Sequence, residues 1–431
     1  MKVEIESQKL VKPCTPTPSH LRRYKISMID ELNPPMHVIR ILYYPPTSNP
    51  INLEPPLAQV LPLFYPLAGR YIKLDHTVDC NDAGAHFSQA RVDCRLHALM
   101  DPAFPPSHLN SLLPVDIAAA DEPTDPMLAI QINRFQCGGV AIGVCASHRI
   151  FDACSLSIFL TAWANAAVGG DLVITPDFNS PSLFPSANVA PLDFGVSRTI
   201  EGRRIVGKRI VFDKNEISRL REKVPVMTTT GRPPSRVVVV STVLTQALLR
   251  ADRVRHGRQR STLIAHAINV RERTVPPVHK HACGTWVSIS YTEYDGEDSR
   301  KLEGDYVTMV GEMREATVRG VVDCGRIFSE EEFGRWVLVD SYAEIAKKGG
   351  RDDYKVIYVT DWSKFGDYDL EMGFGKPVWV SLGDVPLEDL FILMNTRDND
   401  GIEAWVYLDE SDMPFFEQDH HILQLSAATY I

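Results

Sequence analysis

Two apolar, β-rich runs lie on either side of a Gly-Gly pair in the first half of the chain. Residues 127–135 and 140–146 are separated by Gln136-Cys-Gly-Gly139, a pattern that predicts a β-hairpin. The second run is apolar at nearly every position, as expected for a strand buried on both faces. A helix is predicted from about Ala153 to Ala167, with one apolar stripe formed by Ile158, Phe159, Ala162, Trp163 and Ala166.

Strand and helix patterns alternate before this hairpin. Residues 37–44 read as a strand. Residues 57–64 carry apolar side chains at helical spacing, and a turn and a strand are expected at Tyr65-Pro-Leu-Ala-Gly-Arg70. The alternation favours an α/β protein.

The alternation continues in the second half. A strand is predicted at 208–212 and a charged helix from about Asp213. The β-branched run 236–242 follows, with a helix after it to about Arg255. No short-period repeat or low-complexity tract is visible.

The chain has 431 residues, more than one hydrophobic core usually serves, so two domains are expected. Residues 171–193 are rich in Pro, Ser, Asn and Asp with weak periodicity, which marks a connecting segment. We therefore expect an N-terminal domain over 1–180, a crossover linker over 181–205 and a C-terminal domain over 206–431.

The formal net charge is −10, and no Lys/Arg-rich run interleaved with aromatic residues is present. Nucleic acid is therefore not an expected partner. An anionic cofactor would need a local basic cluster or the N–H groups at a helix start. One candidate cluster is Arg203, Arg204, Lys208 and Arg209.

The N-terminal segment Met1-Lys-Val-Glu-Ile-Glu-Ser-Gln8 carries two acidic residues where a signal peptide has its apolar core. No run reaches membrane-spanning length, so we expect a cytoplasmic protein that needs no membrane. The eight cysteines include no Cys-x-x-Cys pair, and reduced, buried thiols are expected in that compartment.

His148 and Asp152 form a His-x-x-x-Asp motif directly after the apolar strand. The pattern alone is weak, because about one copy is expected by chance among 13 histidines, and a second copy occurs at His97 and Asp101. Only His148 follows a rigid, buried strand, where an imidazole can be held within reach of a bound hydroxyl and act as a general base. A satisfied core histidine is the alternative.

Asp152 has two interpretations. It can orient the imidazole, as in a hydrolase triad, or it can play a structural role at the helix start, paired with a cation such as an arginine. We favour the structural role, because a sharp turn lets the two side chains point apart.

Other chemistries have less support. The chain has no Gly-x-Ser-x-Gly nucleophile elbow and no cysteine with an evident activating partner, which favours direct transfer over a covalent intermediate. The pairs His279/His281 and His420/His421 lack further residues at metal-ligand spacing, so no metal site is expected.

With this motif the sequence resembles the BAHD acyltransferases, whose signature is His-x-x-x-Asp followed by a small residue and a helix ending in Trp-Ala. Blocks typical of the family occur in order along the chain at residues 65–70, 148–164 and 269–277. The opening segments 10–20 and 23–27 look most like the vinorine synthase-like branch of alkaloid and alcohol O-acetyltransferases.

The resemblance implies a two-domain fold like chloramphenicol acetyltransferase, with a channel between the domains and His148 in mid-channel. It implies a monomeric enzyme of specialised metabolism that uses acyl-CoA, with acetyl-CoA as the expected donor, and a small-molecule alcohol, possessing no permanently bound cofactor. It further implies an ion pair of Asp152 with an arginine of residues 269–273, Arg271 being favoured. An amine acceptor, another donor such as malonyl-CoA, or a non-catalytic relative remain alternatives.

The family's second signature, Asp-Phe-Gly-Trp-Gly, appears as Glu371-Met-Gly-Phe-Gly375. Gly373 and Gly375 keep the backbone freedom that a tight loop needs. We expect a structural loop with Glu371 satisfied by local hydrogen bonds or a basic residue. The middle block also departs from the family, with Gly284-Thr285 where Gly-Asn is common.

Overall fold

The computed structural model describes residues 1–48, 51–171, 173–187, 192, 196, 204–225 and 233–428. The chain forms two compact units. Unit 1 comprises Met1–Ile200, His279–Trp286 and Phe365–Pro386, and unit 2 comprises Glu201–Val278, Val287–Lys364 and Leu387–Ile431. The sequence predicts that residues 206–431 form one contiguous C-terminal domain. In the structure, His279–Trp286 and Phe365–Pro386 belong to unit 1, so the loop 371–375 lies in unit 1 and not with the rest of the C-terminal half.

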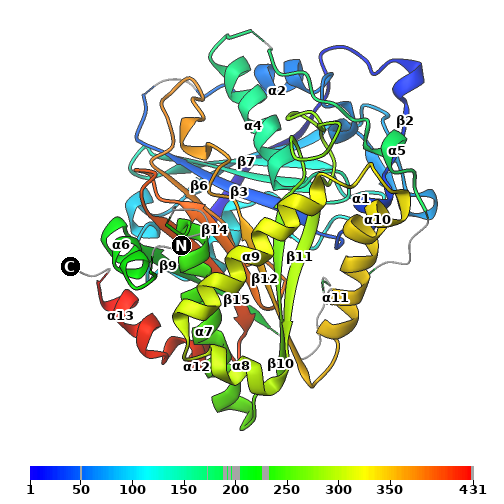
Figure 1. The fold of residues 1–431 in the computed structure, drawn as a ribbon. Coiled ribbons are helices and arrows are strands. Elements are labelled where there is room, and N and C mark those ends of the chain that lie inside the picture. The colour runs from blue at the N-terminus through cyan, green and yellow to red at the C-terminus, as the bar shows by residue number, and fades with distance from the viewer. Residues whose placement is uncertain are drawn as a thin grey trace. The chain divides into compact units, whose positions relative to one another are not determined.

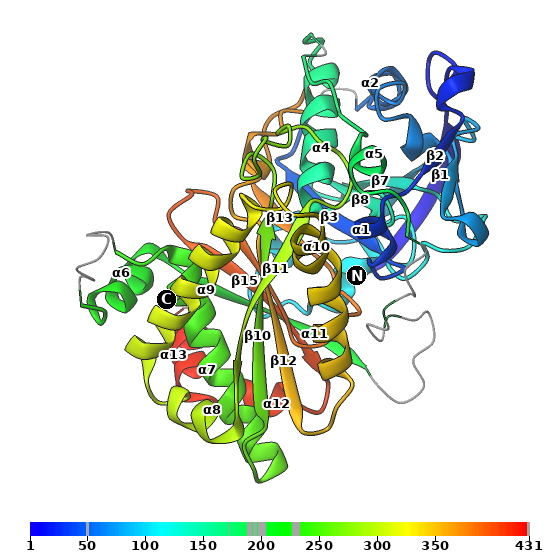
Figure 2. The same ribbon diagram turned by 45° about the vertical axis from the view of Figure 1, so that its right-hand side comes forward.

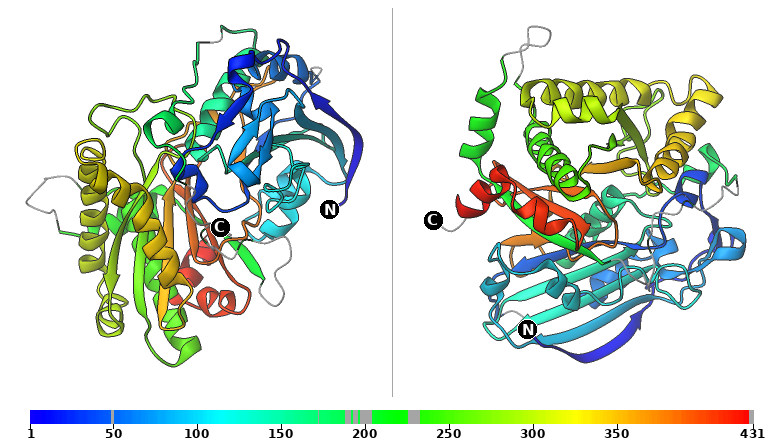
Figure 3. Two further views of the ribbon diagram at one scale, coloured as in Figure 1. Left: turned by 90° about the vertical axis from the view of Figure 1, so that its right-hand side faces the viewer. Right: turned by 90° about the horizontal axis from the view of Figure 1, so that it is seen from below.

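Unit 1 is built on a six-stranded sheet in the order β1-β6-β7-β8-β3-β13. Figure 3 shows β1 along one edge of this sheet. Only β6 and β7 pair in parallel, and the predicted hairpin is confirmed as the antiparallel pair β7–β8. The strands are β1 (Val3–Val11), β3 (His37–Tyr44), β6 (Ala85–Val92), β7 (Leu128–Phe135), β8 (Val140–Ser147) and β13 (Trp379–Ser381).

Every residue of β8 is buried, as its apolar sequence predicts. The helix that follows, α4 (Ala153–Ala167), packs against α2 (Glu54–Val60). The indole Nε1 of Trp163 donates to the carbonyl oxygen of Leu53 at 3.2 Å, and the rings of Phe159 and Phe64 meet edge to face with centroids 5.4 Å apart. These contacts hold the body of α4 in place, and the helix begins directly after the turn that follows β8.

Smaller elements complete unit 1. A three-stranded sheet has the order β2-β5-β4. Its strands are β2 (Arg23–Lys25), β4 (Arg70–Ile72) and β5 (Thr77–Asp79). The short helices are α1 (Met28–Glu31), α3 (Pro106–Leu109) and α5 (Ser180–Leu183).

Unit 2 has a six-stranded sheet in the order β11-β10-β12-β14-β15-β9. Figure 2 shows α7 (Arg236–His256) and α9 (Tyr306–Cys324) on one face and α11 (Ser341–Gly349) on the other. Successive residues of β10 pack on opposite faces of the sheet, which agrees with this placement of the helices. Ile264 belongs to the core under α7, and Leu263 packs with Ile345 of α11. The strands are β9 (Ile205–Phe212), β10 (Ser261–Asn269), β11 (Val287–Tyr294), β12 (Tyr354–Asp361), β14 (Leu390–Asn395) and β15 (Ile402–Asp409).

The β-branched run 236–242 is itself helical. Helix α7 begins at Arg236, where the side chain of Ser235 caps it by accepting from the N–H of Val238 at 3.1 Å. Burial of the valines in the unit 2 core outweighs their weak helix propensity. The remaining helices of unit 2 are α6 (Lys214–Glu222), α8 (Gly296–Leu302), α10 (Glu331–Arg335), α12 (Met413–Glu417) and α13 (His420–Ala428).

Figure 1 shows the helices of both units. Among the described residues, none of these helices combines the length and apolarity required to cross a membrane. All eight cysteines are free thiols. The expectation of burial holds for only part of them, because Cys14 is exposed and three others are partly exposed. The buried ones are Cys80, Cys145, Cys283 and Cys324.

A buried ion pair joins β3 to the segment that returns from the second half of the chain. The guanidinium Nε of Arg40 donates to Asp367 Oδ2 at 3.1 Å, and the two side chains are 0% and 7% exposed. Burial lowers the pKa of Arg40, and the carboxylate of Asp367 opposes that shift. The sequence pattern predicts the strand that contains Arg40, but it does not predict that Asp367 is the partner of this arginine.

Asp367→Asn should lower the free energy of unfolding by about 3–5 kcal/mol, because it leaves a buried guanidinium uncompensated. Asp369→Asn is the matched control in the same turn, since Asp369 pairs with Lys376 at the surface and such pairs contribute about 0–1 kcal/mol. Urea unfolding followed by circular dichroism measures both. Equal losses in the two variants would contradict the account.

Candidate active site

The main chain of His148 is held from both sides at the end of β8. Its N–H donates to the carbonyl oxygen of Met36 at 2.9 Å, and its own carbonyl oxygen accepts from Asn33 Nδ2 at 2.9 Å. The chain then turns at once, because the N–H groups of Ile150 and Phe151 both donate to the carbonyl oxygen of Ser147. The imidazole thus starts from a fixed backbone position.

The next residue, Arg149, holds the neighbouring main chain in place through its guanidinium group. Its Nε and Nη2 donate to the two carboxylate oxygens of Asp121 at 2.7 and 2.8 Å, and Nη1 donates to the carbonyl oxygen of Asn33 at 2.6 Å. Burial acts to raise the pKa of Asp121, but the contacts with Arg149 and then with Lys73 together outweigh it and hold that pKa below its usual range. Arg149 therefore orients the residue that in turn binds the His148 carbonyl.

The His148 ring itself is partly exposed and makes no hydrogen bond to another described residue. Its Nδ1 is buried. Burial lowers the pKa of His148; the nearby carbonyl oxygen of His148 itself and the charge of Asp152 oppose that shift, while Arg149 adds to it. The ring is therefore neutral near pH 7, the state that a general base requires.

Asp152 acts as the N-cap of α4. Its carboxylate accepts from the N–H and the hydroxyl of Ser155 at 2.7 and 2.9 Å, and its other oxygen accepts from the N–H of Trp286 at 3.1 Å. It makes no hydrogen bond to the His148 ring, so the triad-like interpretation lacks its essential contact. The carboxylate instead ties the returning segment His279–Trp286 to the start of α4.

Arg271 follows β10 in unit 2 and is 5% exposed. Its N–H and Nη1 donate to Asn269 Oδ1 at 3.1 and 3.2 Å. Because Arg271 and Asp152 belong to different units, the ion pair between them stays a prediction.

The second His-x-x-x-Asp copy has a different setting. His97 lies exposed in a short 3₁₀ helix, Leu96–Leu99, and Asp101 is exposed in the loop that follows. It has no buried strand behind it. The structure thus separates the two copies as their sequence context suggests.

Thr285 links the returning segment to the residues around His148. Its N–H donates to Asp30 Oδ1 at 2.7 Å, and its hydroxyl oxygen accepts from the same Asn33 amide that binds the His148 carbonyl. Burial raises the pKa of Asp30 to about 6, although hydrogen bonds from Ser27 and Thr285 oppose it. The threonine that departs from the family pattern is therefore part of the support of the site.

The loop 371–375 is closed by its own acidic residue. Glu371 Oε1 accepts from the N–H groups of Gly373 and Gly375 at 2.9 and 2.7 Å, in line with the expected local satisfaction of this carboxylate. The φ angles of these glycines are +84° and +116°. Met372 and Phe374 are buried, and the Phe374 ring meets Tyr44 edge to face with centroids 5.0 Å apart.

The basic cluster considered for an anionic cofactor is largely neutralised. Lys208 pairs with Glu417 at 2.7 Å, and Arg209 and Arg204 likewise contact carboxylates, those of Glu403 and Glu410. Arg203 lies outside the described residues. The cluster therefore does not stand out as a phosphate site.

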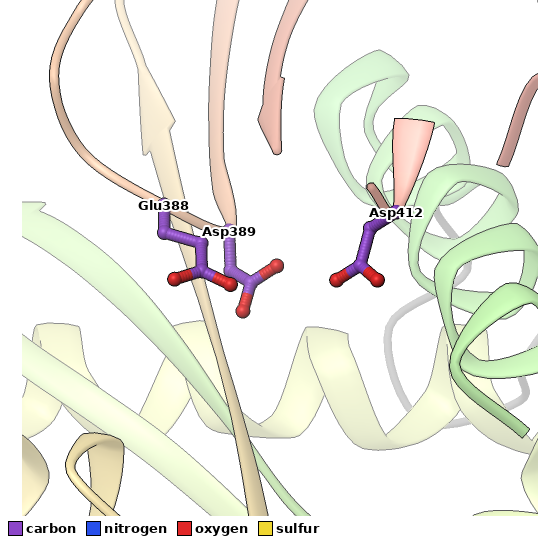
Figure 4. A group of neighbouring side chains, drawn as sticks. All are labelled: Glu388, Asp389 and Asp412. Atoms are coloured by element: carbon purple, nitrogen blue, oxygen red, sulfur yellow. The ribbon is translucent and has the colours of Figure 1, made fainter. Parts of the chain in front are cut away.

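Within the described part of the chain, one group of carboxylates has metal-like spacing, Glu388, Asp389 and Asp412 (Figure 4). The ammonium of buried Lys355 already lies 2.7 Å from Asp389 and 3.4 Å from Asp412. Arg255 also pairs with Asp412. Fixed cations therefore balance this group without a metal ion.

Sequence reasoning did not single out Asn33, Asp121 or Arg149. The position of Arg149 directly after His148 is the one available signal, since a charged residue there either faces water or needs a buried partner. The partners lie 28 and 116 residues away along the chain. Nothing local in the sequence connects them.

Comparisons with known proteins show which family the chain belongs to. The family model described as Transferase family matches residues 1–423. The chain is 37% identical to pelargonidin 3-O-(6-caffeoylglucoside) 5-O-(6-O-malonylglucoside) 4'''-malonyltransferase of Salvia splendens, covering 98% of this chain and 99% of that one. It is 32% identical to stemmadenine O-acetyltransferase of Catharanthus roseus, over 97% and 96% of the two chains.

A solved structure gives the same answer for the fold. The crystal structure of vinorine synthase, an enzyme of Rauvolfia serpentina, superposes with a TM-score of 0.83 at 30% identity and covers 98% of each chain. The fold is thus that of the chloramphenicol acetyltransferase-like α/β proteins, and the class is a coenzyme A-dependent acyltransferase. The chain belongs to the BAHD acyltransferase family.

Gly373→Val should destabilise the protein more than Gly375→Val. Both valines would adopt a strongly disfavoured φ, at a cost of about 1–3 kcal/mol. A side chain at 373 would in addition approach the carbonyl oxygen of Ala167 to 3.3 Å, whereas at 375 the nearest atom is 3.8 Å away.

Thermal unfolding of the two variants checks this order. Gly350→Val is the control, because Gly350 has a φ of −82° and no heavy atom within 4 Å of an added Cβ. The explanation fails if all three variants unfold at the same temperature.

Proposed function

We propose that this enzyme transfers an acetyl group from acetyl-CoA directly to a hydroxyl group of a plant specialised metabolite, with His148 as the general base. The observation that carries the proposal is the His148 ring itself. It is partly exposed, its pKa is lowered, and both its backbone N–H and its carbonyl are fixed by hydrogen bonds.

In the proposed reaction, His148 Nε2 removes the hydroxyl proton while the oxygen attacks the thioester carbonyl. The C–S bond then breaks, and the imidazolium returns the proton to the departing thiolate. The products are an ester and free coenzyme A. A positioned base contributes about 10²–10⁴-fold to such a reaction, and holding both substrates removes much of the entropic cost of their encounter.

We propose an acetyl donor in place of a malonyl donor because the two acyl groups differ in charge. A malonyl group carries a carboxylate that calls for a cation, and bidentate arginine is the usual partner. In unit 1, Arg149 next to the base already directs its guanidinium to Asp121 and to the carbonyl oxygens of Asn33 and Glu31. This engagement favours an uncharged acyl group.

Malonyl transfer is the second candidate, favoured by the 37% identity to a malonyltransferase. An equimolar mixture of acetyl-CoA and malonyl-CoA, offered with a panel of plant alcohols and analysed by mass spectrometry, distinguishes the two. The acetyl ester should predominate.

His148→Ala should lower kcat about 10²–10⁴-fold with an unchanged circular dichroism spectrum, because the base is lost and the fold is not. His97→Ala, which alters the exposed copy of the motif, should retain nearly full activity. A His148→Ala enzyme that keeps more than about a tenth of the wild-type rate would exclude the proposed role.

The pH dependence follows from the direction of the His148 pKa. The neutral ring is the active form, so kcat/KM should fall as the pH drops through the pKa of the free enzyme. Because burial lowers that pKa, the midpoint should lie below about 6.5, the ordinary value for histidine. A profile measured at constant ionic strength whose acidic midpoint lies above 7 would contradict this.

A further inference from the structure

A cavity of about 200 Å³ opens beside the edge strand of the unit 2 sheet. It is lined by residues 288–291 of β11, by Arg319 and Asp323 of α9, and by Trp336 and Ser341 at the start of α11 and the turn before it. Figure 2 shows these elements around β11. No group in this cavity takes part in the chemistry described above.

The backbone of β11 offers hydrogen-bonding groups to this cavity. The carbonyl oxygens of Val287 and Tyr291 point away from β10, because they accept from the Tyr342 hydroxyl and from Arg319 Nη2, each at 3.0 Å. Every second residue of an antiparallel strand directs its N–H and C=O to the same side. Ile289 lies midway between the two and lines the cavity, so its N–H and C=O face outward too.

Two opposite charges stand at the cavity without pairing with each other. Arg319 and Asp323 are one helical turn apart on α9, the spacing at which ion pairs usually form. In the described structure, Arg319 instead bonds the carbonyl oxygen of Tyr291, and the carboxylate of Asp323 has no hydrogen-bond partner. Guanidinium donors and carboxylate acceptors thus remain available to a ligand.

An aromatic surface completes the cavity. Trp336 is 44% exposed, which is unusual for so large an apolar side chain. Its indole can pack against the C–H face of a saturated ring. The cavity is smaller than the roughly 300–1,000 Å³ typical of drug-sized ligands, so it suits a single ring.

We propose that this cavity binds one hexosyl group, either of a free glycoside or as the sugar substituent of a larger molecule. Hydroxyl groups both donate and accept, which matches Asp323, Arg319 and the N–H and C=O of Ile289. The sugar ring lies against Trp336. This site does not depend on the proposed acetyl transfer, because its occupancy is measurable without any acyl donor.

Methyl β-D-glucopyranoside is the probe, titrated into the full-length protein and followed by saturation-transfer difference NMR and by tryptophan fluorescence. Saturable binding in the millimolar range is expected. Trp336→Leu should weaken it at least about tenfold and remove the fluorescence change, and Asp323→Asn should weaken it about tenfold through the lost charged hydrogen bond. Asp298→Asn, on the exposed surface of α8, is the matched control and should bind as wild type does.

Three results would overturn the proposal. Wild-type protein that shows no saturable binding excludes the site. Binding that is equal in wild type, Trp336→Leu and Asp323→Asn places the sugar elsewhere. Saturable binding of alanine as a zwitterion that both variants lose, with no saturable glucoside binding, would assign the cavity to an amino acid instead of a sugar.

Discussion

Asn33 makes the hydrogen bonds on which the candidate site depends. Its side-chain amide donates to the main-chain carbonyl oxygen of His148 and to the hydroxyl oxygen of Thr285, while the main-chain carbonyl oxygen of Asn33 accepts from Arg149. One residue therefore joins the strand end, the turn and the returning segment. Because two of these three bonds are accepted by main-chain oxygens, they fix the backbone from which the imidazole extends.

The parts of this fold that the sequence predicts are those set by local pattern. The uniformly apolar run 140–146 identifies a fully buried strand, and the stripe of 153–167 identifies the helix after it. The residues that hold His148 escape prediction because their contacts span long stretches of chain. The same applies to the segments 279–286 and 365–386, whose return to unit 1 has no local signal. The run 236–242 shows a further limit, since burial decides its helical state against its propensity.

Compensation of buried charge is a second theme. Arg40 with Asp367, Arg149 with Asp121, and Lys355 with Asp389 each place a cation against a carboxylate inside a unit. An unpaired buried charge would lower the free energy of unfolding by several kcal/mol. The first role of these three ion pairs is therefore to stabilise the fold. The charges beside β11 differ, because Arg319 and Asp323 remain apart at an open cavity. That contrast distinguishes a structural charge from one available to a ligand.

Direct transfer assisted by His148 is the central claim, and single-turnover rapid quench with radiolabelled acetyl-CoA and an acceptor alcohol tests it most directly. The account predicts that label moves from thioester to ester with none bound to protein. It also predicts that His148→Ala slows this chemical step by about 10²–10⁴-fold. Label trapped on the protein, or an unchanged chemical step in the variant, would contradict it.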